Sequence, residues 1–278
     1  MSEPNPLNDV KTGAQVVGEI IKAAAGSEEA KVAASNLGRS AVTVTAAINN
    51  VLLPLAALNF AVERARTYFN KKFADDFQSR AAAIPADRLA EPSALIAAPI
   101  LNALAFAHEA PILKDLYLNL LARSMDRQHS ESVHPAFIET IRQLSPEEAE
   151  LIKSVLRDFG VGPIVQVEAR YANSDRVHLY IRNFLDWRDD SPERVLIENP
   201  RMPMLVDNWL RLGLITVDYN RVVSYPSFYN WVETRPEVVK IKEIIARSTD
   251  MTLYIRRGVI ERTDFGRAFG LAVGICNY

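Results

Sequence analysis

The sequence has only one cysteine, Cys276, among its 278 residues. A single thiol can form neither an internal disulfide nor a cluster of thiolate metal ligands, so a disulfide-bonded secreted fold is excluded. The N-terminal residues also lack the basic start and the apolar run of a secretory signal peptide, since no Lys or Arg precedes Lys11. We therefore expect a cytoplasmic protein.

An excess of charge of either sign is missing as well. The chain has 32 basic and 34 acidic residues, a formal net charge of −2, and residues 140–278 balance sixteen Arg and three Lys against nineteen Asp and Glu. A protein face that follows the phosphates of DNA normally shows a basic excess. We therefore do not expect nucleic acid as a partner.

The short motifs of several common enzyme classes are absent. The sequence contains no Gly-x-x-x-x-Gly-Lys phosphate loop, no Gly-x-Ser-x-Gly nucleophile elbow and no His and Cys pairs at the spacing of metal ligands. We therefore expect no cofactor and no metal ion, and a non-enzymatic protein is favoured over an enzyme.

The first half of the chain has the pattern of helices. Apolar residues make up 49% of the sequence, and up to about residue 145 they recur at helical spacing in almost every window. Phe69, Phe73 and Phe77 follow Ala65 at four-residue steps, a stripe that is usually part of a core. The pattern predicts that residues 1–144 are helical and contribute no strand.

Beyond residue 144 the sequence predicts both helices and strands. Ser145-Pro146-Glu147-Glu148 is a capping box that predicts a helix through Phe159, ended by Gly160 and Gly162. Alternating β-branched and aromatic residues then predict strands, all of which we place between residues 163 and 262. The expected elements are strands at 163–171 and 177–181, a helix at 203–212 followed by a strand at 214–217, a helix at 233–247, a hairpin at 252–262 that turns near Arg257-Gly258, and a helix at 267–275.

Two of these segments resemble parts of a winged-helix domain. They are Leu212-Gly213-Leu214-Ile215, similar to the exit of its third helix, and Thr263-Asp264-Phe265-Gly266, similar to the exit of its wing. About fifty residues separate them, so an insertion has to be assumed. The expected fold is mainly α with a smaller α+β part. We expect an N-terminal helical region at 1–88, a further helical part at 89–144 and a C-terminal winged-helix-like module with an insertion at 145–278.

Several blocks of sequence together resemble the abortive infection alpha (Abi-alpha) family of bacterial proteins. The blocks are Leu116-Tyr117-Leu118-Asn119-Leu120-Leu121-Ala122, Met125-Asp126, Val133-His134-Pro135-Ala136-Phe137-Ile138 and Gln143-Leu144-Ser145-Pro146-Glu147-Glu148-Ala149, with Thr263-Asp264-Phe265-Gly266-Arg267-Ala268-Phe269 later in the chain. The resemblance implies a role in defence against phage, in which an infected cell stops supporting phage propagation. It brings no established catalytic residues.

One uncharged segment, residues 40–62, is long enough to cross a membrane. Its twenty-three residues as a helix would span a hydrocarbon core of about 30 Å. However, Asn49, Asn50, Asn59 and Pro54 would each be costly to bury in lipid. We expect a helix bent near Pro54 and packed inside the fold at rest, and conditional membrane contact stays open.

Candidate catalytic residues are few. Arg123 and His129 have the spacing of the Arg and His of HEPN ribonucleases, in which the arginine could hold a phosphate while the histidine moves a proton. The same spacing arises often by chance at a polar helix end. We therefore expect these two residues to be unpaired surface groups.

Candidate binding residues lie in two further places. His134 precedes Pro135, and its ring is expected to cap a helix start rather than to catalyse. Asp186, Trp187 and Asp189 lie in an acidic aromatic loop, which could bind a divalent ion but is more often a solvated turn.

Three classes of function stay open. They are a non-enzymatic defence protein acting through contacts with a protein partner or by self-association, a defence effector acting on the membrane through residues 40–62, and a HEPN-like ribonuclease.

Overall fold

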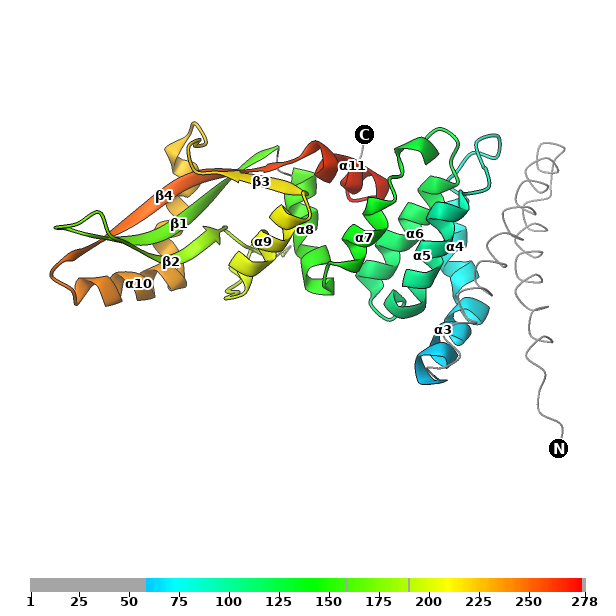
Figure 1. Cartoon of the computed structure of the whole chain (residues 1–278), viewed down its shortest axis with the longest axis horizontal. Helices are drawn as coiled ribbons and strands as arrows, with labels where there is room; N and C mark the ends of the chain where they lie inside the picture. Colours follow the sequence, from blue (N-terminus) through cyan, green and yellow to red (C-terminus); the bar gives the residue numbers. More distant parts are fainter. Residues whose placement is uncertain (1–58, 159, 190, 277–278) are drawn as a thin grey trace. The chain divides into compact units, whose positions relative to one another are not determined.

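The computed structural model describes residues 59–276 except 159 and 190. This part of the chain combines helices with one antiparallel sheet (Figure 1). It divides into two compact units, the first formed by residues up to Leu151 together with those from Ala268 onwards, and the second by Ile152–Arg267. The expected mixture of an N-terminal helical part with a later α+β part is confirmed. The finer division at residues 88 and 144 stays a prediction.

The first unit is helical where the structure describes it. Its elements are α3 (Asn59–Lys71), α4 (Phe73–Ala81), α5 (Ala94–Ala107), α6 (Pro111–Ser124), the short 3-10 helix η3 (Ser130–Ser132), α7 (Ala136–Arg142), the start of α8 (Pro146–Asp158) and the end of α11 (Asp264–Ala272). Residues 59–144 contain no strand, only an isolated bridge between Leu89 and Asp126. The helical prediction is thus confirmed for residues 59–144.

The aromatic stripe lies in the core of this unit. Ala65 and Phe69 of α3 and Phe73 and Phe77 of α4 are all buried, and the rings of Phe73 and Phe77 stack with their centroids 5.7 Å apart. The stripe crosses a break between the two helices at Lys72, which a four-residue period alone could not reveal.

The capping box forms at the start of α8. The backbone N–H of Glu148 donates to Ser145 Oγ at 3.2 Å, and the backbone N–H of Ser145 donates to the Glu148 carboxylate at 2.9 Å. These two bonds satisfy N–H groups that have no partner within the helix. Gly162 does not end α8 as expected, because it already lies in the first strand.

The second unit is built on a four-stranded antiparallel sheet with the strand order β2-β1-β4-β3. The strands are β1 (Val161–Tyr171), β2 (Val177–Phe184), β3 (Ile215–Asp218) and β4 (Met251–Arg262), and the remaining elements are α9 (Met202–Arg211), the 3-10 helix η4 (Pro226–Thr234) and α10 (Pro236–Ala246). The described strands lie near where the sequence placed them, but β1 begins two residues early at Val161, β2 continues three residues further to Phe184, and β3 and β4 differ by one residue.

The expected hairpin near Arg257-Gly258 is wrong. Instead, β4 runs unbroken and pairs with β1 along its whole length, from Tyr171 opposite Met251 to Val161 opposite Glu261. Gly258 serves close packing rather than a turn, since a Cβ atom there would lie 2.6 Å from the Tyr219 ring. The β-branched pattern predicts a strand, but the partner of that strand is distant in sequence.

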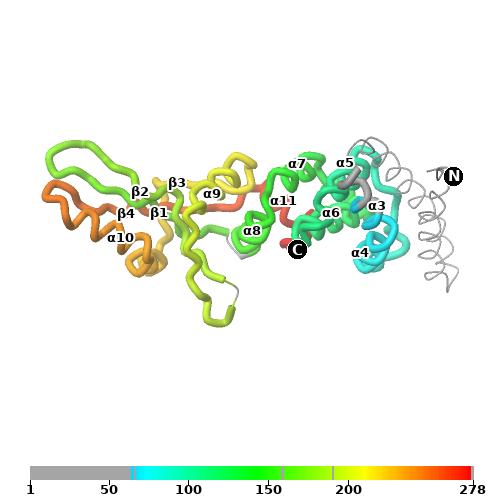
Figure 2. Tube along the Cα trace, turned by 90° about the horizontal axis from the view of Figure 1, so that it is seen from below, coloured from blue at the N-terminus to red at the C-terminus, as the bar shows by residue number. Residues whose placement is uncertain are grey.

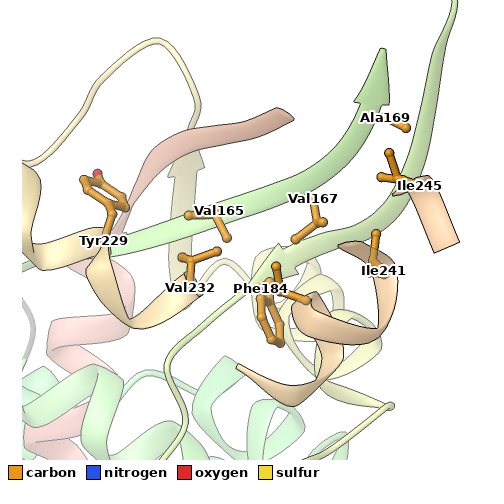
Figure 3. Packing of buried hydrophobic residues seen from close by; sticks show 9 residues of the cluster. Val165, Val167, Ala169, Phe184, Tyr229, Val232, Ile241 and Ile245 are labelled. Carbon is orange, nitrogen blue, oxygen red and sulfur yellow. The ribbon is translucent and has the colours of Figure 1, made fainter. Parts of the chain in front are cut away.

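One face of the sheet is covered by η4 and α10. Val165, Val167 and Ala169 of β1 and Phe184 of β2 point toward these helices (Figure 3). The residues that meet them are Tyr229, Val232, Val238, Ile241 and Ile245. Figure 2 shows α10 running along the sheet. On the opposite face of β4, the side chains of Thr252, Tyr254 and Arg256 are exposed.

The structure does not identify a winged helix. The β1–β2 hairpin lies between α8 and α9 in the chain, so α9 follows a strand rather than a second helix. The starts of two helices also differ from expectation by three residues. The helix expected at 233–247 is α10, preceded by η4, and α11 begins at Asp264 rather than at residue 267. The early start of α11 follows from Thr263, whose Oγ1 accepts the backbone N–H of Gly266 at 2.8 Å.

Part of the apolar segment 40–62 lies outside the described residues. Residues 40–58, with Pro54 and its expected bend, belong to that part, and residues 59–62 begin α3. Among the helices of the described part, none is both long enough and apolar enough to cross a membrane.

Candidate functional site

Asp126 lies between Arg123 and His129 in the chain, and its side chain is hydrogen-bonded to the residues around it. Its carboxylate is buried and accepts hydrogen bonds from Arg88 Nε at 2.9 Å, from Arg88 Nη2 and from the backbone N–H of Gln128 at 3.0 Å. Burial acts to raise the pKa of Asp126, but these hydrogen bonds and the Arg88 charge outweigh it and leave the pKa below its ordinary value. Asp126 is therefore a fixed negative charge beside the end of α6.

His129 lies beside the Asp126 carboxylate. Its Nε2 is 4.0 Å from Asp126 Oδ2, and its side chain is 23% exposed. Burial lowers the pKa of His129, and the positive charge of Arg123 lowers it further. The imidazole is therefore mostly neutral at pH 7.

The expectation that Arg123 and His129 are unpaired surface groups is wrong. Both are half-buried, Arg123 Nε donates to Ser132 Oγ at 3.4 Å, and His129 lies beside Asp126. Burial also lowers the pKa of Arg123. The turn after α6 folds back on itself, because the Asp126 carbonyl accepts the backbone N–H groups of His129 and Ser130, and this brings His129 beside the Asp126 carboxylate.

His134 has the capping role that the sequence predicts. Its Nδ1 accepts the backbone N–H of Ala136, the first residue of α7, at 3.1 Å. An unprotonated Nδ1 is needed to accept this bond, so the neutral ring is the capping form. The exposed ring lies 6.0 Å from that of Phe137.

Asp189 in the acidic loop has a structural role. Its Oδ1 accepts the Ser191 hydroxyl at 2.6 Å and the backbone N–H groups of Ser191 and Val195 at 3.2 and 2.8 Å. The bond from Ser191 is the main cause that lowers the pKa of Asp189. Asp189 therefore closes the turn. Among the described residues, no group of three or more His, Cys, Asp or Glu side chains could hold a metal ion.

Asp186 and Trp187 instead line a cavity in the second unit, with a volume of about 410 Å³. The wall is formed by residues from α8, from the start of β1, from the loop after β2, from η4 and from β4. These residues are Ser154, Val155, Arg157, Pro163, Leu185, Asp186, Trp187, Arg188, Arg194, Ser227, Phe228, Trp231 and Ile260. The cavity is the candidate functional site.

Arg235 holds the loop that forms one side of this cavity. Its side chain is 1% exposed, and its guanidinium donates to the carbonyls of Trp187 and Ile197 at 3.2 and 2.9 Å and to both carboxylate oxygens of Glu237. It also lies 3.9 Å from Asp186 Oδ1. Because one rigid fork binds two loop carbonyls, the loop and the start of α10 are fixed to each other.

Two buried polar atoms in the cavity wall make no hydrogen bond with the described residues. They are Asp186 Oδ1, an acceptor, and Trp231 Nε1, a donor. The other carboxylate oxygen, Asp186 Oδ2, accepts from Arg188 Nε at 2.9 Å. Burying a polar atom without a hydrogen bond is costly, and for Asp186 Oδ1 the positive charge of Arg235 at 3.9 Å offsets part of this cost.

Sequence reasoning missed most of this cavity. It singled out Asp186 and Trp187 for their acidic and aromatic neighbours, but it did not single out Arg188, Arg194 or Trp231. Trp231 lies 44 residues beyond Trp187 in the chain, and no periodicity connects them. The local sequence feature that could have indicated this cavity is the pair Arg188 and Arg194 among the acidic residues of the loop.

The described part of the protein is thus a mixed α/β protein with two compact units. One unit is helical, and the other is built on a four-stranded antiparallel sheet with a cavity beside it. The model of the abortive infection alpha family matches residues 65–273, and the chain belongs to this family. The match covers most of the described part of both units. No curated protein and no solved structure was found to match the chain.

Proposed function

We propose that the protein acts in anti-phage defence by abortive infection, through contacts with other proteins and without catalysis. The single observation that carries the proposal is membership of the abortive infection alpha family over residues 65–273. The proposed place of action is the cytoplasm, which suits a chain with one cysteine.

Exposed apolar side chains support a contact mechanism. Large apolar side chains are half or more exposed in both units, on α5, β2, α9, α10, the loop after β2 and the segment around η4. They are Leu95, Phe106, Val177, Val195, Met204, Val222, Tyr225, Phe228 and Ile244, with exposed fractions from 51% to 78%. Exposed apolar side chains of this size can contribute to a contact surface for a partner or for a second copy.

The test compares infected cells that carry the gene with cells that carry a frameshifted copy. We expect fewer phage plaques with the intact gene, while cellular RNA stays intact and the membrane potential is retained until late in infection. Equal plaque numbers from the two strains would contradict the proposed function. RNA cleavage or early depolarisation would contradict the contact mechanism and favour one of the two alternatives below.

A membrane-acting effector is the first alternative, and its support is the uncharged sequence at residues 40–62. In this alternative the segment leaves the protein interior on infection and enters the lipid. Carbonate extraction of membranes before and after infection tests it. A chain that stays extractable at all times would exclude insertion.

A HEPN-like ribonuclease is the second alternative, supported by the Arg123 charge, which acts on the pKa of His129 beside Asp126. A neutral imidazole can accept a proton, and a nearby guanidinium can hold a phosphate. In this alternative Arg123→Ala and His129→Ala each abolish RNA cleavage, whereas Arg142→Ala, a change at an exposed arginine of α7, leaves it intact.

The winged-helix-like character of the C-terminal module also remains a proposal. It is supported by the passage from α9 into β3 through Gly213, whose positive φ of 70° suits a glycine at a helix end, and by the antiparallel pairing of β3 with β4. An experimental structure in which this module superposes on winged-helix domains would support the description.

A further inference from the structure

We propose that the cavity beside Asp186 binds a mononucleotide, with the base against Trp231 and Phe228 and the phosphate near Arg188 and Arg194. The proposal goes beyond the role in defence and does not depend on it. Binding is a property of the purified chain and can be measured without phage.

The cavity has the size and the wall of a small-ligand site. Its volume of about 410 Å³ lies in the range of roughly 300–1,000 Å³ that is typical of such sites. Phe228 is 51% exposed, and Trp187 and Trp231 are further aromatic residues of the wall. Nucleobases stack on aromatic side chains of this kind, whichever base is present.

The two unsatisfied polar atoms fit the edge of a base. Asp186 Oδ1 can accept one hydrogen bond, and Trp231 Nε1 can donate one. Nucleobases present an N–H group next to a ring nitrogen or carbonyl oxygen on the same edge. A base offers both a donor for Asp186 Oδ1 and an acceptor for Trp231 Nε1, together with an apolar face for the aromatic wall, which an inorganic anion lacks.

The charge of the described wall suits a phosphate. Three arginines, Arg157, Arg188 and Arg194, line the cavity with one aspartate. Arg188 is held in place by its bonds to Asp186 Oδ2 at 2.9 Å and to the Arg194 carbonyl at 3.3 Å. Guanidinium groups bind phosphate through paired N–H donors, so an arginine whose position is already fixed loses little freedom on binding.

The backbone of Arg194 has an unusual conformation. Its φ of 50° lies in the left-handed region, which is uncommon for a residue other than glycine and costs free energy. The turn closed by Asp189 imposes this conformation, since Asp189 accepts the N–H of the next residue, Val195. The exposed Arg194 side chain thus extends from a fixed turn at the cavity wall.

Isothermal titration calorimetry on the purified full-length chain tests the proposal. The probes are AMP, GMP, CMP and UMP, with the four nucleosides and inorganic phosphate as separate arms. We expect saturable binding of at least one mononucleotide, binding of its nucleoside that is at least about tenfold weaker, and no saturable binding of phosphate alone.

Two variants and a matched control locate the site. Arg194→Gln should weaken mononucleotide binding by about tenfold and leave nucleoside binding unchanged. Trp231→Phe keeps an aromatic ring but removes the N–H donor, so it should weaken binding of both mononucleotide and nucleoside. Arg247→Gln removes an exposed arginine after α10 that is not part of the cavity wall, and it should bind as the wild type does.

Three outcomes would overturn the proposal. The first is the lack of saturable binding of any mononucleotide up to about 1 mM. The second is binding of phosphate alone as tight as that of the mononucleotide, which would indicate a simple anion site. The third is an equal loss of affinity in Arg194→Gln and Arg247→Gln, which would place binding elsewhere or make it unspecific.

Discussion

Asp126 links two segments of the first unit that are 38 residues apart. It pairs with Arg88, and backbone bonds join the same two segments, from the N–H of Arg127 to the Arg88 carbonyl and from the N–H of Ala90 to the Met125 carbonyl. The Asp126 side chain is 9% exposed, so water cannot easily replace the hydrogen bonds that Arg88 and Gln128 donate to it. At the scale of single residues, Asp126 is the clearest structural anchor near the candidate pair Arg123 and His129.

Asp126→Asn should therefore destabilise the protein. The variant keeps one acceptor but loses the charge opposite Arg88, and we expect the free energy of unfolding to fall by about 1–3 kcal/mol. Urea unfolding followed by circular dichroism measures it. Glu139→Gln is the matched control, because the pair of Glu139 with Arg142 is about half exposed and should contribute less than about 0.5 kcal/mol. Equal effects of the two substitutions would contradict the anchoring role.

The contribution of Asp126 should depend on pH. Because its pKa is lowered in the folded protein, the stabilisation is present in full above the unfolded-state pKa of about 3.9 and is lost as the pH falls through the folded-state value. We expect the stability difference between wild type and Asp126→Asn to be constant from pH 7 to about pH 5 and to shrink below about pH 4. Urea unfolding of both proteins across this range tests it. A difference that grows as the pH falls would be the opposite result.

Among the elements, α11 depends on a glycine at its first turn. A Cβ atom on Gly266 would lie 2.0 Å from the Leu214 carbonyl oxygen, and Thr263 joins the two segments by donating from Oγ1 to the Gly213 carbonyl at 2.5 Å. The start of α11 is thus in direct contact with the backbone that leads from α9 into β3. Only glycine permits this approach.

Gly266→Ala should be strongly destabilising for this reason. The added methyl group meets backbone, which cannot rotate away, so we expect a loss of about 1–3 kcal/mol or more in the free energy of unfolding. Gly160→Ala is the control, because nothing lies within 4 Å of the corresponding Cβ position. Thermal unfolding by calorimetry compares the two. If Gly266→Ala and Gly160→Ala had the same melting temperature, the close contact between Gly266 and the Leu214 backbone would not be important for stability.

Elements specified by local sequence could be predicted, whereas those specified by distant partners could not. The start of α8 followed from Ser145 and Glu148, which cap each other three residues apart, and the buried faces of α3 and α4 followed from the apolar period. The interpretation of β4 failed because Arg257-Gly258 resembles a turn locally. Its pairing with β1 about 90 residues away keeps the strand extended.

The same distinction holds for the candidate site. The capping role of His134 involves residues two positions apart and was predicted. The cavity brings together side chains from α8, β4 and the segments after β2 and around η4, and it depends on Arg235, a buried side chain that charge pattern alone would place in solvent. Residues brought together by tertiary packing leave no signal of spacing in a single sequence.

For the whole molecule, the family match spans residues 65–273 and therefore includes parts of both compact units. The helical unit contains the charged cluster around Asp126, and the sheet unit contains the cavity beside Asp186. We expect defence to need both units, since the family is defined over the two together.

The number of phage released per infected cell, measured together with the survival of those cells, tests the central claim most directly. Cells with the intact gene and cells with the frameshifted copy are infected so that every cell receives a phage. Abortive infection predicts a much smaller phage yield with the intact gene, while the infected cells still fail to form colonies. Equal phage yields, or a reduced yield from cells that survive and divide, would contradict it.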